Sequence, residues 1–170
     1  GVVGVLVAQV ARAHGAEGIV LADRMPARRR LCAELGFEGF VQAGQGDFAA
    51  DLAAAGPFDL VFDNACTRET IGAAVEALDP GGTLLLLGFP HGGEDVPLTY
   101  AKAYKWELSV LLSRNYAPAD FADAIALLQR GRIDAARMVT GVWPLGEFDR
   151  AYASLRQQPD RHVKVILQPG

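Results

Sequence analysis

Hydrophobic residues in this chain follow two spacings that alternate along the sequence. Near the start, apolar residues recur every three or four positions, as on one face of a helix, and Gly15 is a typical helix end. The run Ile19-Val20-Leu21-Ala22 then follows, apolar without interruption and of strand length. Continuous apolar runs that alternate with amphipathic stretches indicate parallel strands covered by helices on both faces.

This alternation continues along the chain and predicts most of its elements. The predicted helices are Val3 to His14, Pro26 to Leu35, Phe48 to Ala55, Glu69 to Leu78, Tyr100 to Trp106, Pro118 to Arg130 and Leu145 to Gln157. The predicted strands are Ile19 to Ala22, Phe40 to Ala43, Leu60 to Asp63, Thr83 to Leu87, Leu108 to Leu112 and Val163 to Leu167. Asp79-Pro80-Gly81-Gly82 predicts a turn before the fourth strand. The pattern therefore predicts an α/β fold with a Rossmann-like, doubly wound parallel sheet.

Composition excludes several classes of protein. The 170 residues are 51% hydrophobic, which excludes a disordered chain, and the net charge of −4 argues against a nucleic-acid partner. No apolar run approaches the roughly 18 residues of a membrane span, so we expect no membrane partner. Cys32 and Cys66 form neither a metal-binding pair nor a disulfide framework, so we expect a cytoplasmic protein. The chain opens on Gly1 without a charged leader, and we expect it to begin inside a longer protein.

The first four residues, Gly1-Val2-Val3-Gly4, carry part of a dinucleotide-binding pattern. Gly1 and Gly4 have the spacing of the second and third glycines of G-x-G-x-x-G, which let backbone approach a pyrophosphate and let the helix pack on the strand. The first glycine and the preceding strand would lie before residue 1. Close packing of a helix would by itself explain the same spacing.

Asp23 strengthens this hypothesis, because it ends the second strand of such a unit, where an acidic side chain binds the adenosine ribose hydroxyls. A carboxylate there repels a 2′-phosphate and favours NAD over NADP. The alternative is that Asp23 starts a turn or caps the following helix. Arg24 and Arg28 lie close in sequence and could balance a 2′-phosphate, so NADP stays open as the cofactor.

Two later strand ends would line the same crevice, since ligands of open parallel sheets bind beyond the carboxyl ends of the strands. These are Asn64, Ala65 and Cys66, after the third strand, and Leu87, Gly88 and Phe89, at the end of the fourth. The segment His91-Gly92-Gly93-Glu94-Asp95 has metal-ligand side chains but no second cluster to complete a site, and we interpret it as a polar loop. We therefore assign no metal ligand and no catalytic residue.

Several segments together resemble the medium-chain dehydrogenase/reductase family, which includes the zinc-dependent alcohol dehydrogenases. They are GVVGVLVAQVARAHGA, VLADRMPARRRLCAELGF, FDLVFDNA, ALDPGGTLLLLGFP, DFADAIALLQRGRIDAARMVTGVWPLGEFDRAYASL and HVKVILQP. The resemblance covers essentially the whole chain and matches the C-terminal, cofactor-binding part of such proteins. The segment Leu112-Ser113-Arg114-Asn115-Tyr116 leans toward the polyol, sugar-acid and threonine dehydrogenase branch.

The resemblance implies a role for each matching residue. The pyrophosphate turn would include Gly1, Val3 and Gly4, the ribose acid would be Asp23, and Arg28 would lie beside the adenosine. Ser113, Arg114 and Asn115 would pass the nicotinamide, and Lys164 would lie near the pyrophosphate. Residues 1–112 would form the NAD-binding domain and residues 113–170 a segment returning to a catalytic domain. Zinc ligands, proton relay and the central first strand of the sheet would all lie upstream of residue 1.

We therefore expect the cofactor-binding portion of an NAD-dependent, zinc-assisted dehydrogenase that transfers hydride between a secondary alcohol or polyol and nicotinamide. This stretch alone would be inactive, and the whole protein would be a homodimer or homotetramer joined near Leu108 to Leu112. Three alternatives stay open. They are a zinc-free quinone-reductase relative that uses NADPH, an S-adenosylmethionine-dependent methyltransferase, and a non-enzymatic nucleotide-binding module.

Overall fold

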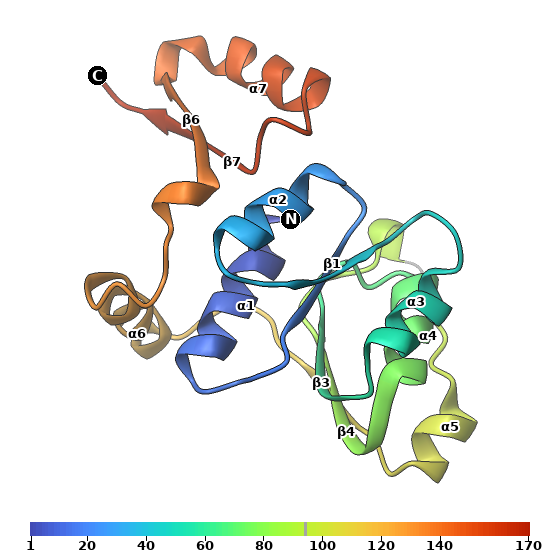
Figure 1. The fold of residues 1–170 in the computed structure, drawn as a ribbon. Coiled ribbons are helices and arrows are strands. Elements are labelled where there is room, and N and C mark those ends of the chain that lie inside the picture. Colours follow the sequence, from blue (N-terminus) through green and yellow to red (C-terminus); the bar gives the residue numbers. More distant parts are fainter. Residues whose placement is uncertain (94) are drawn as a thin grey trace. The chain divides into compact units, whose positions relative to one another are not determined.

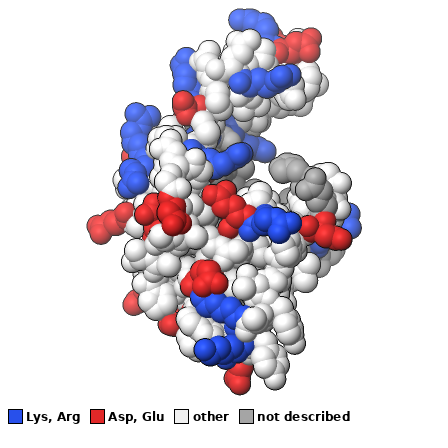
Figure 2. Space-filling view, turned by 90° about the vertical axis from the view of Figure 1, so that its right-hand side faces the viewer, with Lys and Arg blue, Asp and Glu red and all other residues white. Residues whose placement is uncertain are grey.

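The computed structural model describes residues 1–93 and 95–170 (Figure 1). The chain forms two compact units. One contains residues 1–40 and 118–170, and the other contains residues 41–117. On the face shown in Figure 2, acidic and basic side chains are interspersed. Within the described residues, no helix combines the length and the apolar character needed to cross a membrane.

The first unit begins with α1 (Val2–Ala13), β1 (Val20–Asp23) and α2 (Ala27–Glu34). The chain returns to it through α6 (Pro118–Gln129), β6 (Val139–Pro144), α7 (Phe148–Gln157) and β7 (Lys164–Gln168), with short 3-10 turns η2 (Ala136–Met138) and η3 (Leu145–Glu147). β1 pairs with β2 (Gly39–Gln42), and the first part of this unit ends at Phe40, inside β2. β6 pairs in parallel with β7.

The core of the first unit joins the start and the end of the chain. Buried apolar side chains of α1, β1 and α2 pack with Met138 from η2, which is only 3% exposed. Gln9 of α1 is completely buried in this region, and its side chain is satisfied because its Oε1 accepts the amide of Asp134 over 2.7 Å. Because a buried polar group left unpaired is costly, the Gln9 side chain favours the one position of the returning segment that brings the Asp134 amide to it.

The second unit contains α3 (Phe48–Ala55), β3 (Phe58–Asp63), α4 (Arg68–Ala77), β4 (Leu78–Leu86), η1 (His91–Gly93), α5 (Tyr100–Lys105) and β5 (Ser109–Leu112). Its strands follow the order β3-β4-β5 and all pairs are parallel. Helices α3 and α4 lie side by side (Figure 1). Val75, Leu78 and Leu84 are fully buried at the centre of the core between α4 and the sheet.

Alternating helices and parallel strands confirm the predicted Rossmann-like α/β fold, and most element ends lie within two residues of the predicted ones. One difference is the predicted turn at residues 79–82, which lies inside β4. Phe58 pairs with Leu78 and Leu60 with Thr83, so these four residues bulge from the ladder. Proline and two glycines predict a turn locally, but pairing on both sides keeps the strand continuous.

The predicted helix at residues 145–157 was wrong at its start, because residues 145–147 form η3 and α7 begins at Phe148. The strand β6 was not among the predicted strands. Its side chains alternate between half-buried and exposed along six residues, as a strand requires, but Gly141 and Pro144 weaken that signal in the sequence.

Candidate cofactor site

The start of α1 and the end of β1 are neighbours in the first unit. The amino group of Gly1 contacts Oδ2 of Asp23, while Oδ1 of Asp23 accepts the amide of Met25 over 2.8 Å. That second bond closes a turn ahead of α2 and does not cap the helix, whose N-cap residue is Pro26 and which has no side-chain cap. The glycine pattern and the acidic residue predicted from spacing are therefore brought together.

The N-terminal turn of α1 lies at the surface, and Val3 is 50% exposed. Gly4 lies half-buried in the first turn of the helix, which contains no acidic residue. Free amide groups and the helix dipole make such a turn suitable for an anion such as a pyrophosphate.

The predicted basic residues of the first unit have different surroundings. Arg24 follows Asp23 and is exposed, and Lys164 is exposed at the start of β7. Arg28 is instead 7% exposed, and its Nη2 donates to the carbonyl oxygens of His162 over 2.6 Å and Pro159 over 3.2 Å. The guanidinium of Arg28 is thus directed into the protein.

The carboxylate of Asp63 organises the end of β3 in the second unit. One of its oxygens accepts the amides of Ala65 over 2.8 Å and Cys66 over 3.0 Å, and the other accepts the hydroxyl of Thr70 over 2.6 Å. Thr70 also forms a reciprocal capping box with Thr67 at the start of α4. Neither threonine was among the predicted site residues, although the spacing T-x-x-T before a helix is a usable signal of a helix start.

Two features of this strand end have chemical consequences. Oδ1 of Asn64 is buried and has no hydrogen-bond partner among the described residues, which is unusual for a buried polar atom. Cys66 is 2% exposed and adopts a positive φ of 49°. Burial raises the pKa of its thiol, and the nearby Asp63 carboxylate raises that pKa further, so the thiol is a poor nucleophile at neutral pH.

Gly88 brings the end of β4 against the end of β3. A side-chain carbon on Gly88 would lie 2.4 Å from the carbonyl oxygen of Asn64 and 3.1 Å from Sγ of Cys66. The amide of Leu87 donates to the carbonyl of Asp63 over 2.9 Å, which holds the two strand ends in register. Phe89, the next residue, is 79% exposed. Glycine is required here by a close backbone approach.

The last predicted segment continues from β5. Ser113 donates its amide to the carbonyl of Leu86 over 3.0 Å, so it extends the pairing of β5 with β4. Arg114 is exposed, and Asn115 is exposed with a left-handed φ of 65°. Asn64, Ala65, Cys66, Leu87, Gly88 and Ser113 thus surround one end of the sheet in the second unit.

Both sets of residues fit parts of a dinucleotide. An acid beside a glycine-containing helix start suits a ribose and a pyrophosphate, and the unpartnered Asn64 oxygen suits a donor such as an amide or a hydroxyl. A zinc ion has no such fit, because no three His, Cys, Asp or Glu side chains gather within residues 1–93 and 95–170. Glu94, part of the predicted polar loop, lies outside the described residues.

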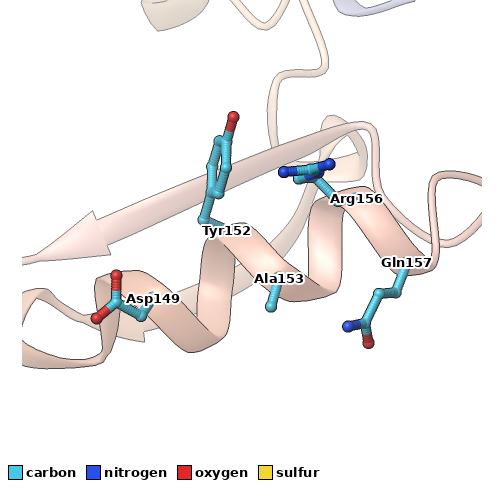
Figure 3. A pocket seen from close by; sticks show the side chains of 5 residues that line it. All are labelled: Asp149, Tyr152, Ala153, Arg156 and Gln157. Carbon is cyan, nitrogen blue, oxygen red and sulfur yellow. The ribbon is translucent and has the colours of Figure 1, made fainter.

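A hollow on α7 is lined by none of the predicted residues. Asp149, Tyr152, Ala153, Arg156 and Gln157 line it, and all five come from one helix (Figure 3). Their side chains point in different directions along the helix surface, so they converge on no common point. We therefore do not consider this hollow a candidate ligand site.

The alternating parallel strands, with polar groups and glycines at their carboxyl ends, define the Rossmann-like class of α/β proteins. Residues 2–130 match the family model described as zinc-binding dehydrogenase. The chain belongs to this family, which confirms the resemblance inferred from the sequence.

Known relatives agree with the polyol and sugar-acid branch. The chain is 25% identical over 173 residues to a sorbitol dehydrogenase of Halalkalibacterium halodurans, a match that covers 99% of this chain and 50% of the relative. It is 30% identical to an L-galactonate-5-dehydrogenase of Escherichia coli, covering 89% of this chain and 45% of that protein. The chain therefore spans about half the length of the curated relatives it matches.

Solved structures share the fold. A short chain alcohol dehydrogenase of E. coli CFT073, solved with NADH, superposes with a TM-score of 0.89 at 23% identity over 99% of this chain and 50% of that chain. An alcohol dehydrogenase of Thermus sp. ATN1 gives a TM-score of 0.88 at 26% identity, covering 100% of this chain and 49% of that one.

Proposed function

We propose that this chain is the cofactor-binding part of an NAD-dependent, zinc-assisted alcohol or polyol dehydrogenase that acts on a secondary alcohol. The observation that carries the proposal is the carboxylate of Asp23 at the end of β1, beside the start of α1. Family membership, and relatives described as sorbitol and L-galactonate-5-dehydrogenases, support the substrate class. Residues 1–112 would form the NAD-binding domain, and residues 113–170 would return to a catalytic domain.

Each residue would act through the group that it presents. Asp23 would accept hydrogen bonds from the ribose hydroxyls, and the first-turn amides of α1, opened by Gly1 and Gly4, would bind the pyrophosphate, with Val3 packing beside it. Arg24, next to Asp23, would contact the outer side of the adenosine, and Lys164 the pyrophosphate. These charges would orient the cofactor without taking part in the reaction.

The residues of the second unit would position the nicotinamide, which supplies the hydride acceptor when it is bound. Asn64, Ala65 and Cys66 would flank it at the end of β3, with Oδ1 of Asn64 accepting from a ligand donor. Gly88 would allow close backbone approach between Leu87 and Phe89. Ser113, Arg114 and Asn115 would close the other side. Zinc would be held by residues other than those described, which offer no ligand set.

Cofactor titration tests this proposal. NADH and NADPH are titrated separately into the chain, with binding followed by nicotinamide fluorescence. We expect NADH to bind at least tenfold more tightly, and Asp23→Ser to weaken NADH binding and narrow the difference, because the carboxylate both holds the ribose and repels a 2′-phosphate. Glu38→Ser, which removes an exposed acid of the same unit, is the control. Equal binding of both cofactors, or no effect of Asp23→Ser, would refute the proposal.

The same measurements separate the remaining alternatives. A quinone-reductase relative would prefer NADPH, and a non-enzymatic module would bind NADH while the whole protein turned over no alcohol. Family membership removes the methyltransferase alternative. The two cysteines are free and buried, which supports a reducing, cytoplasmic location for the protein.

Assembly through β5 forms a second part of the proposal. This strand ends the order β3-β4-β5, and its Leu111 and Leu112 are 52% and 82% exposed. Pairing with β5 of a second copy would continue the sheet and satisfy the backbone groups of this edge, giving a homodimer or homotetramer. Light scattering is expected to show a dimer or tetramer that Leu112→Lys dissociates, and a monomeric native protein would contradict this.

A further inference from the structure

Arg28 is a buried cation that the proposed cofactor site does not use. It lies in the first turn of α2 and is 7% exposed, whereas Arg30 of the same helix has a side chain that is 88% exposed. Burial of a guanidinium is costly unless its donors are paired. The interactions of Arg28 are therefore specific rather than those of a solvated helix face.

Those interactions reach the other end of the chain. Nη2 of Arg28 donates to the carbonyl oxygens of His162 over 2.6 Å and Pro159 over 3.2 Å. Both carbonyls belong to the connection between α7 and β7, and all of these residues lie in the same compact unit. Two carbonyls that accept from one nitrogen fix the connection more strictly than one would.

The connection is held on its other sides as well. The hydroxyl of Ser154 and Nε2 of His162 lie 2.8 Å apart, which ties the connection to α7. Oγ1 of Thr140 accepts the amide of Val163 over 2.9 Å, which ties it to β6. Val163 also packs against the core that α2 helps to form. Arg28 adds a polar contact from α2 to this set.

We propose that Arg28 is a positioning residue that clamps the connection at residues 159–162 onto α2 and does not present its charge to the cofactor. Its Nε is also buried, without a partner among the described residues, so this donor faces the interior as well. Discrimination between NADH and NADPH then depends on Asp23, with Arg24 as the exposed cation beside it. This second half rests on the proposed function, whereas the clamp does not.

Amide hydrogen exchange and cofactor titration on the full chain test both halves. Arg28→Ala is expected to raise exchange at residues 160–163 by about tenfold or more, because a charged hydrogen bond is lost. Exchange in β3 and β4 is expected to stay unchanged, and Arg28→Lys is expected to restore part of the protection, since an ammonium can donate but lacks the planar fork. Arg30→Ala, from the exposed face, is the control. The ratio of NADH to NADPH affinity should change by less than about twofold in each variant.

Two results would overturn the proposal. One is unchanged exchange at residues 160–163 in Arg28→Ala. The other is a shift of the affinity ratio toward NADH by about fivefold or more, which would mean that Arg28 contacts a 2′-phosphate. If the native chain binds neither cofactor, the proposed function fails. The exchange data still show whether Arg28 holds the connection between α7 and β7. If Arg28→Ala does not fold, Arg28→Lys supplies the same two measurements.

Discussion

The hydroxyl of Thr70 donates to the carboxylate of Asp63 over 2.6 Å, which joins the end of β3 to the first turn of α4. The other carboxylate oxygen accepts the amides of Ala65 and Cys66. One buried side chain therefore shapes the turn at which the proposed site begins. A carboxylate is well suited to this place because the start of a helix carries a partial positive charge.

Asp63→Ala should lower the free energy of unfolding by about 3 kcal/mol, because the buried amide of Cys66, the part-buried amide of Ala65 and the hydroxyl of Thr70 lose their acceptor. Urea denaturation measures this loss. Asp59→Ala, which removes an exposed acid of the same strand, is the control and should change stability by less than about 0.5 kcal/mol. A similar small loss for both variants would mean that the three donors find other acceptors.

Gly88→Ala should destabilise the protein by about 2 kcal/mol or more, since the added carbon would lie 2.4 Å from the carbonyl oxygen of Asn64. Gly72→Ala is the matched control, because it lies within α4 with no atom within 4 Å of the added carbon. There the change should stabilise the helix by about 0.5 to 1 kcal/mol. Thermal denaturation of both variants would reveal opposite signs, and equal signs would contradict the packing argument.

Gln9→Leu should cost about 1 to 3 kcal/mol although leucine suits a buried helix position. The substitution removes the acceptor of the part-buried Asp134 amide, which then lacks this partner. The same change at exposed Gln157 of α7 is the control, with an expected effect within about 0.5 kcal/mol. Denaturation midpoints of the two variants decide the matter. An unaffected Gln9→Leu protein would show that the returning segment does not depend on this bond.

Cys66 should make stability depend on pH in the alkaline range. Burial raises the pKa of its thiol in the folded state, and Asp63 adds to that rise. An unfolded thiol ionises near pH 8.5, so the stabilising contribution is fully present below that pH and is lost as pH rises through the folded-state pKa. Because burial raises the pKa of Cys32 as well, the test compares Cys32→Ala with Cys32→Ala/Cys66→Ala in urea between pH 7 and 10. The loss above pH 8.5 should be larger in the variant that retains Cys66.

Local patterns were sufficient for much of the fold. The apolar periodicity of α1 and the uninterrupted apolar run of β1 specify their conformations within a few neighbouring residues, and β1 ends at the acid that spacing nominated, Asp23. The strand β6 and the bulge in β4 were missed for one reason. Glycine and proline favour turns locally, and only pairing with β7 or β3 overrides that preference.

The amino-acid sequence by itself determined most of the elements and their order, the α/β class and the family resemblance, because these depend on short-range patterns of apolar residues and glycines. Only the tertiary structure decided which polar side chains are committed to the protein. Arg28 and Arg30 are neighbouring arginines of one helix, and the sequence suggested Arg28 as a cofactor contact. In the structure Arg28 is bound to carbonyls more than a hundred residues away, whereas Arg30 is exposed. Asp63 and Gln9 gained their roles in the same way. The contacts of a buried polar group depend on what the folded chain places beside it, and no local pattern records that neighbour.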